Sequence, residues 1–374
     1  MADKARIAFW EPPEDRRILV VSDIHGNLPY FEGLLKKLAF SGQDELVIDG
    51  DFLEKGAESL SLLRRLMALS AAGNTHCLNG NCDTWYGIFR PDCGPETDRP
   101  FLHYVQYKGC GLLWDMCAEL GLDPMAIEDF TPVKARLRTA FPAEWDFLRS
   151  LPDAIETERF IFAHAGMTPG KPLREHTRDE LNRIDRFLDR PMRFDKWLVV
   201  GHYPVVLYGE NIVCADPIIE RDKHVICLDG GCVLKDDGQL NALIIPRRDS
   251  EDFSFAAYDP FPEYRVLDDQ AGGGPSYYIR WGDSRVQVLE RGEEFSRCRH
   301  VRTGYEMDIL TKYLFTDREF TDCNDSTDYV LPLKRGDRVR VVEETSRGFL
   351  VKHGGTSGWY FGRLGEGPDF PEKT

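Results

Sequence analysis

Short, uninterrupted runs of apolar residues recur through the first two-thirds of the chain and constrain its fold more than any other feature. The runs are 18–22, 45–48, 75–78, 159–163, 197–200, 224–228, 239–245 and 253–258. Runs of Val, Ile, Leu and Phe of this length are typical of strands buried on both faces. Helical patterns lie at 31–40 and 57–72, and Thr177 with Glu180 forms a capping-box pattern that predicts a helix over LNRIDRFL. This alternation predicts an α/β core.

A polar residue and a glycine stand together at the end of each of the first six runs. In chain order these tips are Asp23-Ile-His25-Gly26, Gly50-Asp51, Gly80-Asn81, His164-Ala-Gly166, Gly201-His202 and Asp229-Gly230. Ligand sites of open α/β sheets form beyond the carboxyl ends of the strands, so we expect the tips to converge. Carboxylates, an amide and imidazoles gathered at one edge are ligands for divalent metals. A turn explains any one tip, but it does not explain the whole ordered set.

The order D-x-H, G-D, G-N-x-D, H and G-H resembles the calcineurin-like metallophosphoesterase superfamily. It is closest to the branch that contains the bacterial Ser/Thr protein phosphatases and the diadenosine tetraphosphatases. Three segments carry the resemblance, which covers roughly residues 16–258: GDFLEKG at 50–56, LPDAIETERFIFAHAGM at 151–167 and LDGGCVLKDDGQLNALIIP at 228–246. The resemblance implies a two-sheet sandwich flanked by helices.

The same resemblance implies a site for two divalent metal ions, with Mn²⁺ or Fe as the first expectation and Zn²⁺ as the second. Asp23 and His25 would hold the first ion, Asp51 would bridge both, and the second would be held by Asn81, His164 and His202. A hydroxide bridging the two ions would attack phosphorus in line. The implied activity is hydrolysis of phosphomonoesters, with Ser/Thr phosphoproteins as the first substrate class. A phosphodiesterase or dinucleoside-polyphosphate hydrolase is the enzymatic alternative, and a scaffold protein with a degenerate phosphatase core is the alternative from another class.

Further catalytic candidates surround Asp51, and three of them depart from the pattern of the protein phosphatases. Cys82 stands where those enzymes have a histidine, and a thiol is a poorer acid–base partner than imidazole, which favours leaving groups of low pKa or phosphodiesters. Glu54-Lys55 replaces Asp-Arg. The Lys55 ammonium would therefore contact phosphate as a point charge, whereas an arginine guanidinium would form two parallel hydrogen bonds. Asp83 completes the G-N-x-D pattern. The alternatives are that Cys82 only fills buried space and that Lys55 is a solvated residue at a helix start.

Composition divides the chain into a catalytic domain and a tail. Residues 1–258 form the expected catalytic domain, and its aromatic- and proline-rich segment 84–151 is expected as a helical insertion. Prolines and a triple glycine at 259–275 indicate a linker. Short β-like segments fill 276–324. The expected fold class is therefore α/β, a metallophosphoesterase-type sandwich with a C-terminal all-β tail.

The last part of the tail, residues 325–374, resembles bacterial SH3-like domains. It has paired Val strands, Gly354-Gly355 where a hairpin turn is needed, and the sequence Gly358-Trp359-Tyr360. The resemblance implies a peptide or cell-wall fragment as ligand. The alternative is that the basic residues of this segment form only a solvated strand face.

Charge and targeting signals limit the possible partners. The chain has 47 Lys and Arg against 63 Asp and Glu, a net charge of −16, which argues against nucleic acid and anionic membranes as partners. The start of the chain lacks the apolar core of a signal peptide, and no apolar stretch reaches the roughly 18 residues of a membrane span. Ten cysteines without a CxxC pair favour reduced thiols and a cytoplasmic location. The expected partner is a phosphorylated substrate, either a phosphoprotein or a small phosphoester.

Overall fold

A computed structural model describes residues 3–89, 93–317 and 320–365 of the chain. The chain divides into two compact units. Unit 1 comprises residues 1–204, 217–234 and 239–259, and unit 2 comprises residues 205–216, 235–238 and 260–374. Two short segments from the middle of the chain therefore belong to the C-terminal unit.

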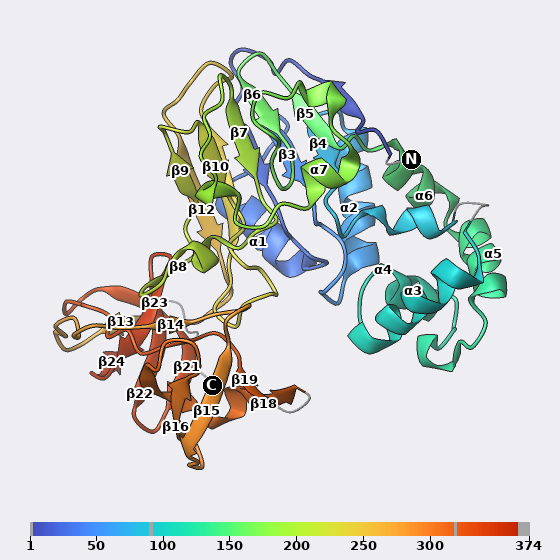
Figure 1. Ribbon diagram of the computed structural model, residues 1–374. Coiled ribbons are helices and arrows are strands. Elements are labelled where there is room, and N and C mark those ends of the chain that lie inside the picture. Colours follow the sequence, from blue (N-terminus) through green and yellow to red (C-terminus); the bar gives the residue numbers. More distant parts are fainter. Residues whose placement is uncertain (1–2, 90–92, 318–319, 366–374) are drawn as a thin grey trace, which may run out of the picture. The chain divides into compact units, whose positions relative to one another are not determined.

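Unit 1 is built on two β-sheets (Figure 1). The strands of the first sheet are, in spatial order, β1 (Ile7–Phe9), β5 (Ala154–Glu156), β6 (Phe160–Phe162), β7 (Trp197–Val200), β10 (Val225–Cys227) and β9 (Ile218–Glu220). Those of the second are β12 (Ser254–Tyr258), β11 (Leu240–Ile245), β2 (Ile18–Val21), β3 (Glu45–Asp49) and β4 (Thr75–Leu78). Each apolar run that was predicted to be a strand forms one; the central strands are covered on both faces, whereas β12 is an edge strand that stays partly exposed.

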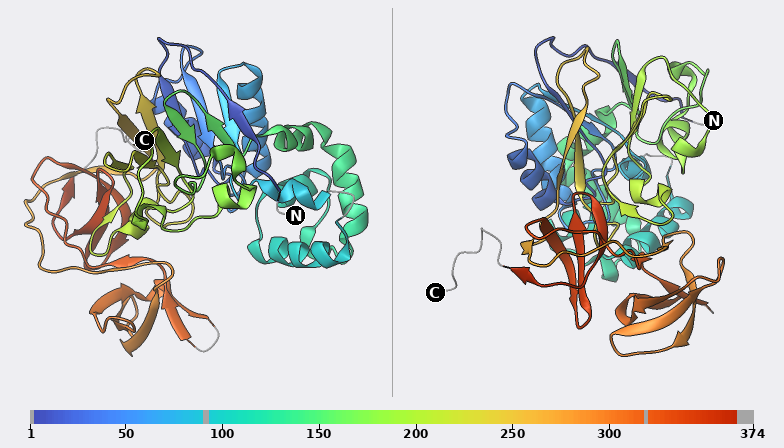
Figure 2. Two further views of the ribbon diagram at one scale, coloured as in Figure 1. Left: turned by 45° about the horizontal axis from the view of Figure 1, so that its top comes forward. Right: turned by 90° about the vertical axis from the view of Figure 1, so that its left-hand side faces the viewer.

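The inner faces of the two sheets pack against each other in one apolar cluster, which includes Val20 and Val47 from one sheet and Phe162 and Val199 from the other. The opposite face of the second sheet is covered by α1 (Leu28–Lys37) and α2 (Ser59–Ala71), drawn in blue in Figure 2. Leucines at helical spacing form the buried stripe of each helix. The predicted α/β fold is confirmed, with two stacked sheets and helices on an outer face.

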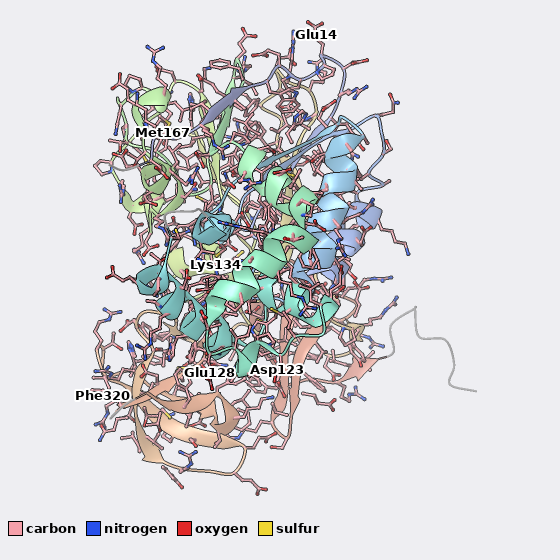
Figure 3. The ribbon with its side chains drawn as sticks, turned by 90° about the vertical axis from the view of Figure 1, so that its right-hand side faces the viewer. Glu14, Asp123, Glu128, Lys134, Met167 and Phe320 are labelled. Atoms are coloured by element: carbon pink, nitrogen blue, oxygen red, sulfur yellow. The ribbon has the colours of Figure 1, made fainter. Side chains whose placement is uncertain are left out.

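The segment expected to be a helical insertion contains η1 (Thr84–Phe89), α3 (Pro95–Lys108), α4 (Leu112–Glu119), η2 (Pro124–Ala126), α5 (Phe130–Ala140) and α6 (Pro142–Ser150). Residues 90–92 of this segment lie outside the described ranges. Lys134, labelled among these helices in Figure 3, is buried. Its Nζ donates to Asp98 Oδ1 at 2.9 Å and to the Cys93 carbonyl oxygen at 3.2 Å. One buried ammonium therefore ties α3 to α5.

One predicted helix is shorter than its sequence pattern. The capping box of Thr177 and Glu180 is present, but α7 covers only Arg178–Asn182 instead of continuing through LNRIDRFL. The helix ends where its C-cap Arg183 adopts a φ of −143°, and the chain turns again at Arg186, which has a φ of 51°. The turn brings the Phe187 ring against Gly166, where a Cβ atom would lie 2.5 Å from the ring. Tertiary packing of this ring overrides the local helical preference.

Unit 2 consists of β structure with two separate apolar cores. One sheet has the order β24 (Leu364–Gly365), β13 (Glu263–Val266), β21 (Arg338–Thr345), β22 (Gly348–His353), β23 (Thr356–Tyr360) and β8 (Val213–Cys214). The other contains β17 (Glu306–Leu310), β16 (Phe295–His300), β15 (Arg285–Glu290), β19 (Phe320–Cys323) and β18 (Leu314–Asp317), and a separate pair joins β14 (Tyr278–Ile279) to β20 (Ser326–Thr327).

Two details of unit 2 bear on the sequence predictions. The predicted two-residue turn Gly354-Gly355 joins β22 to β23. Strand β13 lies inside the segment 259–275 that was expected to be a linker, and it pairs with β21 and β24. In the described part of the chain, no helix combines the length and the apolar character that crossing a bilayer requires.

Candidate metal centre

The loops that carry the predicted metal ligands leave the carboxyl ends of parallel strands in both sheets. β2, β3 and β4 are parallel neighbours, and so are β6, β7 and β10. Backbone hydrogen bonds hold the loops together: Asp23 N–H donates to Gly50 O at 3.1 Å, His25 N–H to Asp51 O at 3.0 Å, and Gly201 N–H to His164 O at 2.8 Å. The predicted convergence of the tips is present, but the tips come from the carboxyl ends of strands in two stacked sheets rather than from one sheet edge.

Four of the predicted ligands adopt backbone conformations that residues other than glycine rarely adopt. The φ angles of Asp23, His25, Asp51 and His202 are 54°, 52°, 48° and 67°. Such conformations cost about 1–3 kcal/mol each and persist where the surrounding structure enforces them, which is typical of functional sites.

Two glycines provide space for the carboxylates. A Cβ atom on Gly80 would lie 2.1 Å from Asp51 Oδ1, and one on Gly201 would lie 2.1 Å from Asp23 Oδ2. Any larger residue would displace these carboxylates. The glycines beside the polar tips are thus required by close approach of the backbone to the site.

The ligand atoms form two groups that share one carboxylate. His25, Asp51 and Cys82 each offer an atom within 4.8 Å of the other two, and so do Asp51, His164 and His202. His25 Nδ1 donates to the Leu53 carbonyl oxygen at 3.2 Å, and His164 Nδ1 donates to the Asp49 carbonyl oxygen at 2.9 Å. These bonds fix both rings and leave each Nε2 as the atom available to a metal, as second-shell partners of metal-binding histidines do.

Asp23 and Asn81, the remaining predicted ligands, lie at the edges of these two groups. Asp23 Oδ1 is 3.8 Å from His25 Nε2, and Asp23 Oδ2 accepts from the His202 N–H at 2.9 Å. The terminal amide atom of Asn81 that faces the site lies 2.7 Å from His202 Nδ1 and 3.1 Å from the Asn182 carbonyl oxygen. An amide nitrogen there would donate to both, whereas a bound cation would attract the amide oxygen to that position.

The electrostatics of the site favour neutral imidazoles at His25 and His202 and a charged imidazole at His164, beside Asp51. Burial, reinforced by the Lys55 ammonium, lowers the pKa of His25 to about 3. Burial and His164 lower the pKa of His202 to about 4. Burial opposes protonation of His164, but the Asp51 carboxylate, 3.3 Å from its Nε2, raises the pKa of that imidazole to about 10.

Buried carboxylates crowd the site. Burial raises the pKa of Asp23 well above its ordinary value, and the neighbouring Asp229 raises it further. Burial also acts to raise the pKa of Asp51, but His164 and His25 hold it well below its ordinary range. Negative charge of this density inside a protein calls for cations.

The residues present fit divalent metals. Asp23 Oδ1 and Asp229 Oδ2 are buried and make no hydrogen bond, and Asp23 Oδ1 lies 3.8 Å from His25 Nε2. A buried polar atom without a partner is expensive unless a ligand completes it. The donor set of carboxylate, amide oxygen and imidazole suits Mn²⁺, Fe²⁺ and Zn²⁺.

The catalytic candidates beside Asp51 take different positions. Lys55 Nζ lies 3.3 Å from His25 Nε2. Asp83 joins two loops, since its oxygens accept from Leu53 N–H at 3.0 Å and from Gly80 N–H at 2.8 Å. Cys82 is buried, and its N–H donates to Asp51 Oδ1 at 2.7 Å.

Glu54 faces the helical insertion. Its Oε1 accepts from the Leu112 N–H, at the start of α4, at 3.1 Å. Burial raises its pKa to about 7, against the lowering effect of that N–H group. The contact ties the loop after β3 to the insertion, and a catalytic role for Glu54 stays a prediction.

Two acidic residues at the site, Asp229 and Asp185, were not among the metal ligands predicted from the sequence. Asp229 is buried, its Oδ1 accepts from Gly231 N–H at 2.8 Å, and its Oδ2 has no partner. Its position at a strand tip was the signal that could have found it. Asp185 lies 3.3 Å from His202 Nε2, and it comes from an irregular segment that gives no sequence signal.

The family model for calcineurin-like phosphoesterases matches residues 16–230. Among solved structures, one assigned provisionally as a diadenosine tetraphosphatase is 21% identical, with a TM-score of 0.42, and the match covers 68% of this chain and 99% of that one. A protein serine/threonine phosphatase from Saccharomyces cerevisiae is 12% identical, with a TM-score of 0.42 and coverage of 69% and 84%. A metallophosphoesterase from Sphaerobacter thermophilus is 18% identical, with a TM-score of 0.36 and coverage of 65% and 88%. A search of curated proteins gives no match.

The family match spans more than half of the chain and includes every predicted metal ligand. The chain belongs to the calcineurin-like phosphoesterase family. It is a metal-dependent phosphoesterase, a hydrolase of phosphate esters.

Proposed function

We propose that this phosphoesterase hydrolyses phosphomonoesters at a dinuclear metal centre, with phosphorylated Ser and Thr side chains of proteins as its first substrate class. The observation that carries the proposal is the pair of ligand groups that share Asp51. A carboxylate common to two cation sites is what a two-metal hydrolase requires. When bound, the two ions would supply Lewis acidity and a water activated for attack.

The side chains of the site divide the remaining work. Asp23 and His25 would hold the first ion, and Asn81, His164 and His202 the second. Asp83 keeps the loops after β3 and β4 at a fixed spacing through its two backbone hydrogen bonds.

Lys55 supports the choice of a monoester. Its Nζ is 3.3 Å from His25 Nε2, and the nearby Cys82 and Asp51 raise its pKa although burial opposes this. The ammonium therefore stays charged beside the proposed phosphate position. A monoester brings two negative charges, which an additional cation next to the metals would neutralise.

Hydrolysis of a phosphodiester or a dinucleoside polyphosphate is the second candidate, and Cys82 favours it. Burial raises the pKa of this thiol well above its ordinary value, and Asp51 raises it further. Such a group is a weak proton donor to a leaving alkoxide. A phosphate leaving group, as in a polyphosphate, departs without a proton donor.

Phosphate release by the full-length protein tests the proposal. The substrates are a phosphoserine peptide, p-nitrophenyl phosphate, bis-p-nitrophenyl phosphate and diadenosine tetraphosphate, each with Mn²⁺ and with a chelator. Faster metal-dependent turnover of the two monoesters supports the first candidate. Preference for the dinucleotide or the diester would replace it with the second, and no metal-dependent turnover of any substrate would overturn both.

A further inference from the structure

The family pattern places Cys82 next to the reacting phosphate. In the structure, Cys82 also lies beside His25 and Asp51, two predicted ligands of the first metal ion. Its Sγ is within 4.8 Å of both His25 Nε2 and a carboxylate oxygen of Asp51. The side chain is buried, with 6% of its surface exposed. Among the described residues, this trio and the trio of Asp51, His164 and His202 are the groups with such convergence.

Without Cys82, the first metal site would have fewer protein ligands than the second. The second site has Asp51, Asn81, His164 and His202 around it. The first has only Asp23, His25 and Asp51, and Asp23 already accepts a hydrogen bond from His202 through Oδ2. Its remaining atom, Oδ1, is buried without a partner 3.8 Å from His25 Nε2. A sulfur donor from Cys82 would add a fourth protein ligand on this side, and the water needed for catalysis would then make the ion five-coordinate.

The neighbours of the sulfur suit a thiolate ligand. If a cation at the second site attracted the Asn81 amide oxygen, Asn81 Nδ2 would lie 3.3 Å from Cys82 Sγ and donate to it. Without an ion the opposite orientation is favoured, because that oxygen would face the Asn182 carbonyl oxygen at 3.1 Å. The Cys82 backbone N–H donates to Asp51 Oδ1 at 2.7 Å, which fixes the side chain next to the shared carboxylate.

We propose that Cys82 is a protein ligand of the first metal ion, which makes that site a mixed oxygen, nitrogen and sulfur site. The inference rests on the proposed dinuclear centre. Binding the ion would release the thiol proton to solvent. Sulfur ligands favour Zn²⁺ and Fe²⁺ over the harder Mn²⁺, so the first site would discriminate among metals more sharply than the second. It also follows that Cys82 gives no proton to the leaving group.

Cobalt substitution of the full-length protein tests the assignment. The wild type, loaded with two equivalents of Co²⁺, should show a thiolate-to-cobalt charge-transfer band in the near ultraviolet. Cys82→Ser should lose the band, and Cys82→Ala serves as a second variant should the serine variant fail to fold. Cys110→Ser is the matched control, because its thiol donates to the Lys55 carbonyl oxygen at 3.3 Å but belongs to neither ligand group. X-ray absorption of zinc-loaded wild type should show a sulfur neighbour at about 2.3 Å.

The outcomes separate this assignment from the proposed function. Two bound cobalt ions without a charge-transfer band would overturn the role of Cys82 and leave the dinuclear centre standing. A band that survives in the Cys82 variants, or that disappears in Cys110→Ser, would also overturn it. A wild type that binds no metal would overturn the dinuclear centre itself.

Discussion

The metal centre of unit 1 concentrates strained backbone and buried polar atoms without partners, whereas the β structure of unit 2 contains few of either in its described residues. In the described residues, every non-glycine residue with positive φ belongs to unit 1, and the metal-ligand candidates Asp23, His25, Asp51 and His202 are among them. Asp23 Oδ1 and Asp229 Oδ2 are buried there without a hydrogen bond. In the described residues of unit 2, Arg280 Nη1 and Ser357 Oγ are the buried side-chain atoms without a partner, and the buried Tyr360 hydroxyl is paired with the carbonyl oxygens of Asp268 and Arg363, both at 3.0 Å.

The difference shows that unit 1 departs further than unit 2 from the arrangement that would give the most stable fold. Strained backbone and unpaired buried polar atoms destabilise a fold, and they persist where a ligand or a reaction requires them. Unit 2 shows the ordinary pattern, with exposed ion pairs such as Arg363–Asp268 at 2.8 Å on its surface. The contrast locates the chemistry of the protein in unit 1.

The largest effect is expected for Asp51→Asn. Losing the shared negative charge should lower metal-dependent turnover about 10³-fold, the upper range for removing one electrostatic stabiliser. The asparagine oxygen can still accept from the Cys82 N–H, so the circular dichroism spectrum should not change. Asp308→Asn in unit 2 is the control and should leave turnover unchanged. A fall in turnover of less than tenfold for Asp51→Asn would contradict the bridging role.

A paired buried charge away from the metal centre provides the next test. Lys134→Met leaves the buried Asp98 uncompensated and should lower the free energy of unfolding by about 3–5 kcal/mol. Denaturant titration measures the change. The double variant Lys134→Met, Asp98→Leu should recover most of the loss, because no charge then stays buried without a partner. Equal destabilisation by the single and the double variant would show that packing, rather than charge, is responsible.

Metal binding should stabilise unit 1 selectively. At a metal concentration of about 100 Kd, a ligand that binds only the native state adds about 2.7 kcal/mol, which slows hydrogen exchange through global opening about 100-fold. Core amides such as Val20 and Val47 of unit 1 should slow by that factor. Those of Val339 and Val351 in unit 2 should not change. Equal slowing in both units would remove the contrast between them.

Gly201→Ala tests the space around Asp23. The added Cβ would lie 2.1 Å from Asp23 Oδ2, which should lower the free energy of unfolding by about 1–3 kcal/mol and weaken metal binding. Gly42→Ala is the matched control in the same unit, because a Cβ there meets nothing within 4 Å. Its free energy of unfolding should stay within about 0.5 kcal/mol of wild type. Calorimetric metal titration of both variants decides the point.

The smallest effect is expected for Tyr360→Phe in unit 2. Removing the hydroxyl leaves the carbonyl oxygens of Asp268 and Arg363 without this donor and should lower the free energy of unfolding by about 1 kcal/mol. Metal-dependent turnover should be unchanged. A loss of turnover would show that unit 2 shapes the site, and the two units would no longer differ in function.

Much of the fold and of the candidate site could be predicted from the sequence. The apolar runs predicted the strands because a strand buried on both faces needs continuous apolar residues. The polar tips predicted the converging loops because parallel strands end at the same edge. The helix over LNRIDRFL was predicted too long, because the contact of Phe187 with Gly166 is set by tertiary packing.

The position of Cys82 marks the limit of motif reasoning. The motif placed it beside the reacting phosphate, as a weak acid–base partner or as a residue that only fills buried space. The structure places its Sγ within 4.8 Å of ligand atoms of both His25 and Asp51, and that convergence depends on loops far apart in the sequence. The proximity of Asp229 to Asp23 likewise depends on tertiary structure, because their strands β10 and β2 belong to different sheets.

The sequence by itself determined which residue types stand at each strand end, because periodicity, glycine positions and motif order are local properties. Only the tertiary structure decided which of these side chains come close enough to hold a cation together, since distances between loops depend on how the sheets stack. It also decided which ring nitrogens are available, because the carbonyl oxygens of Leu53 and Asp49 hold the Nδ1 atoms of His25 and His164. Metal chemistry requires positions accurate to fractions of an ångström, and local sequence carries no information at that scale.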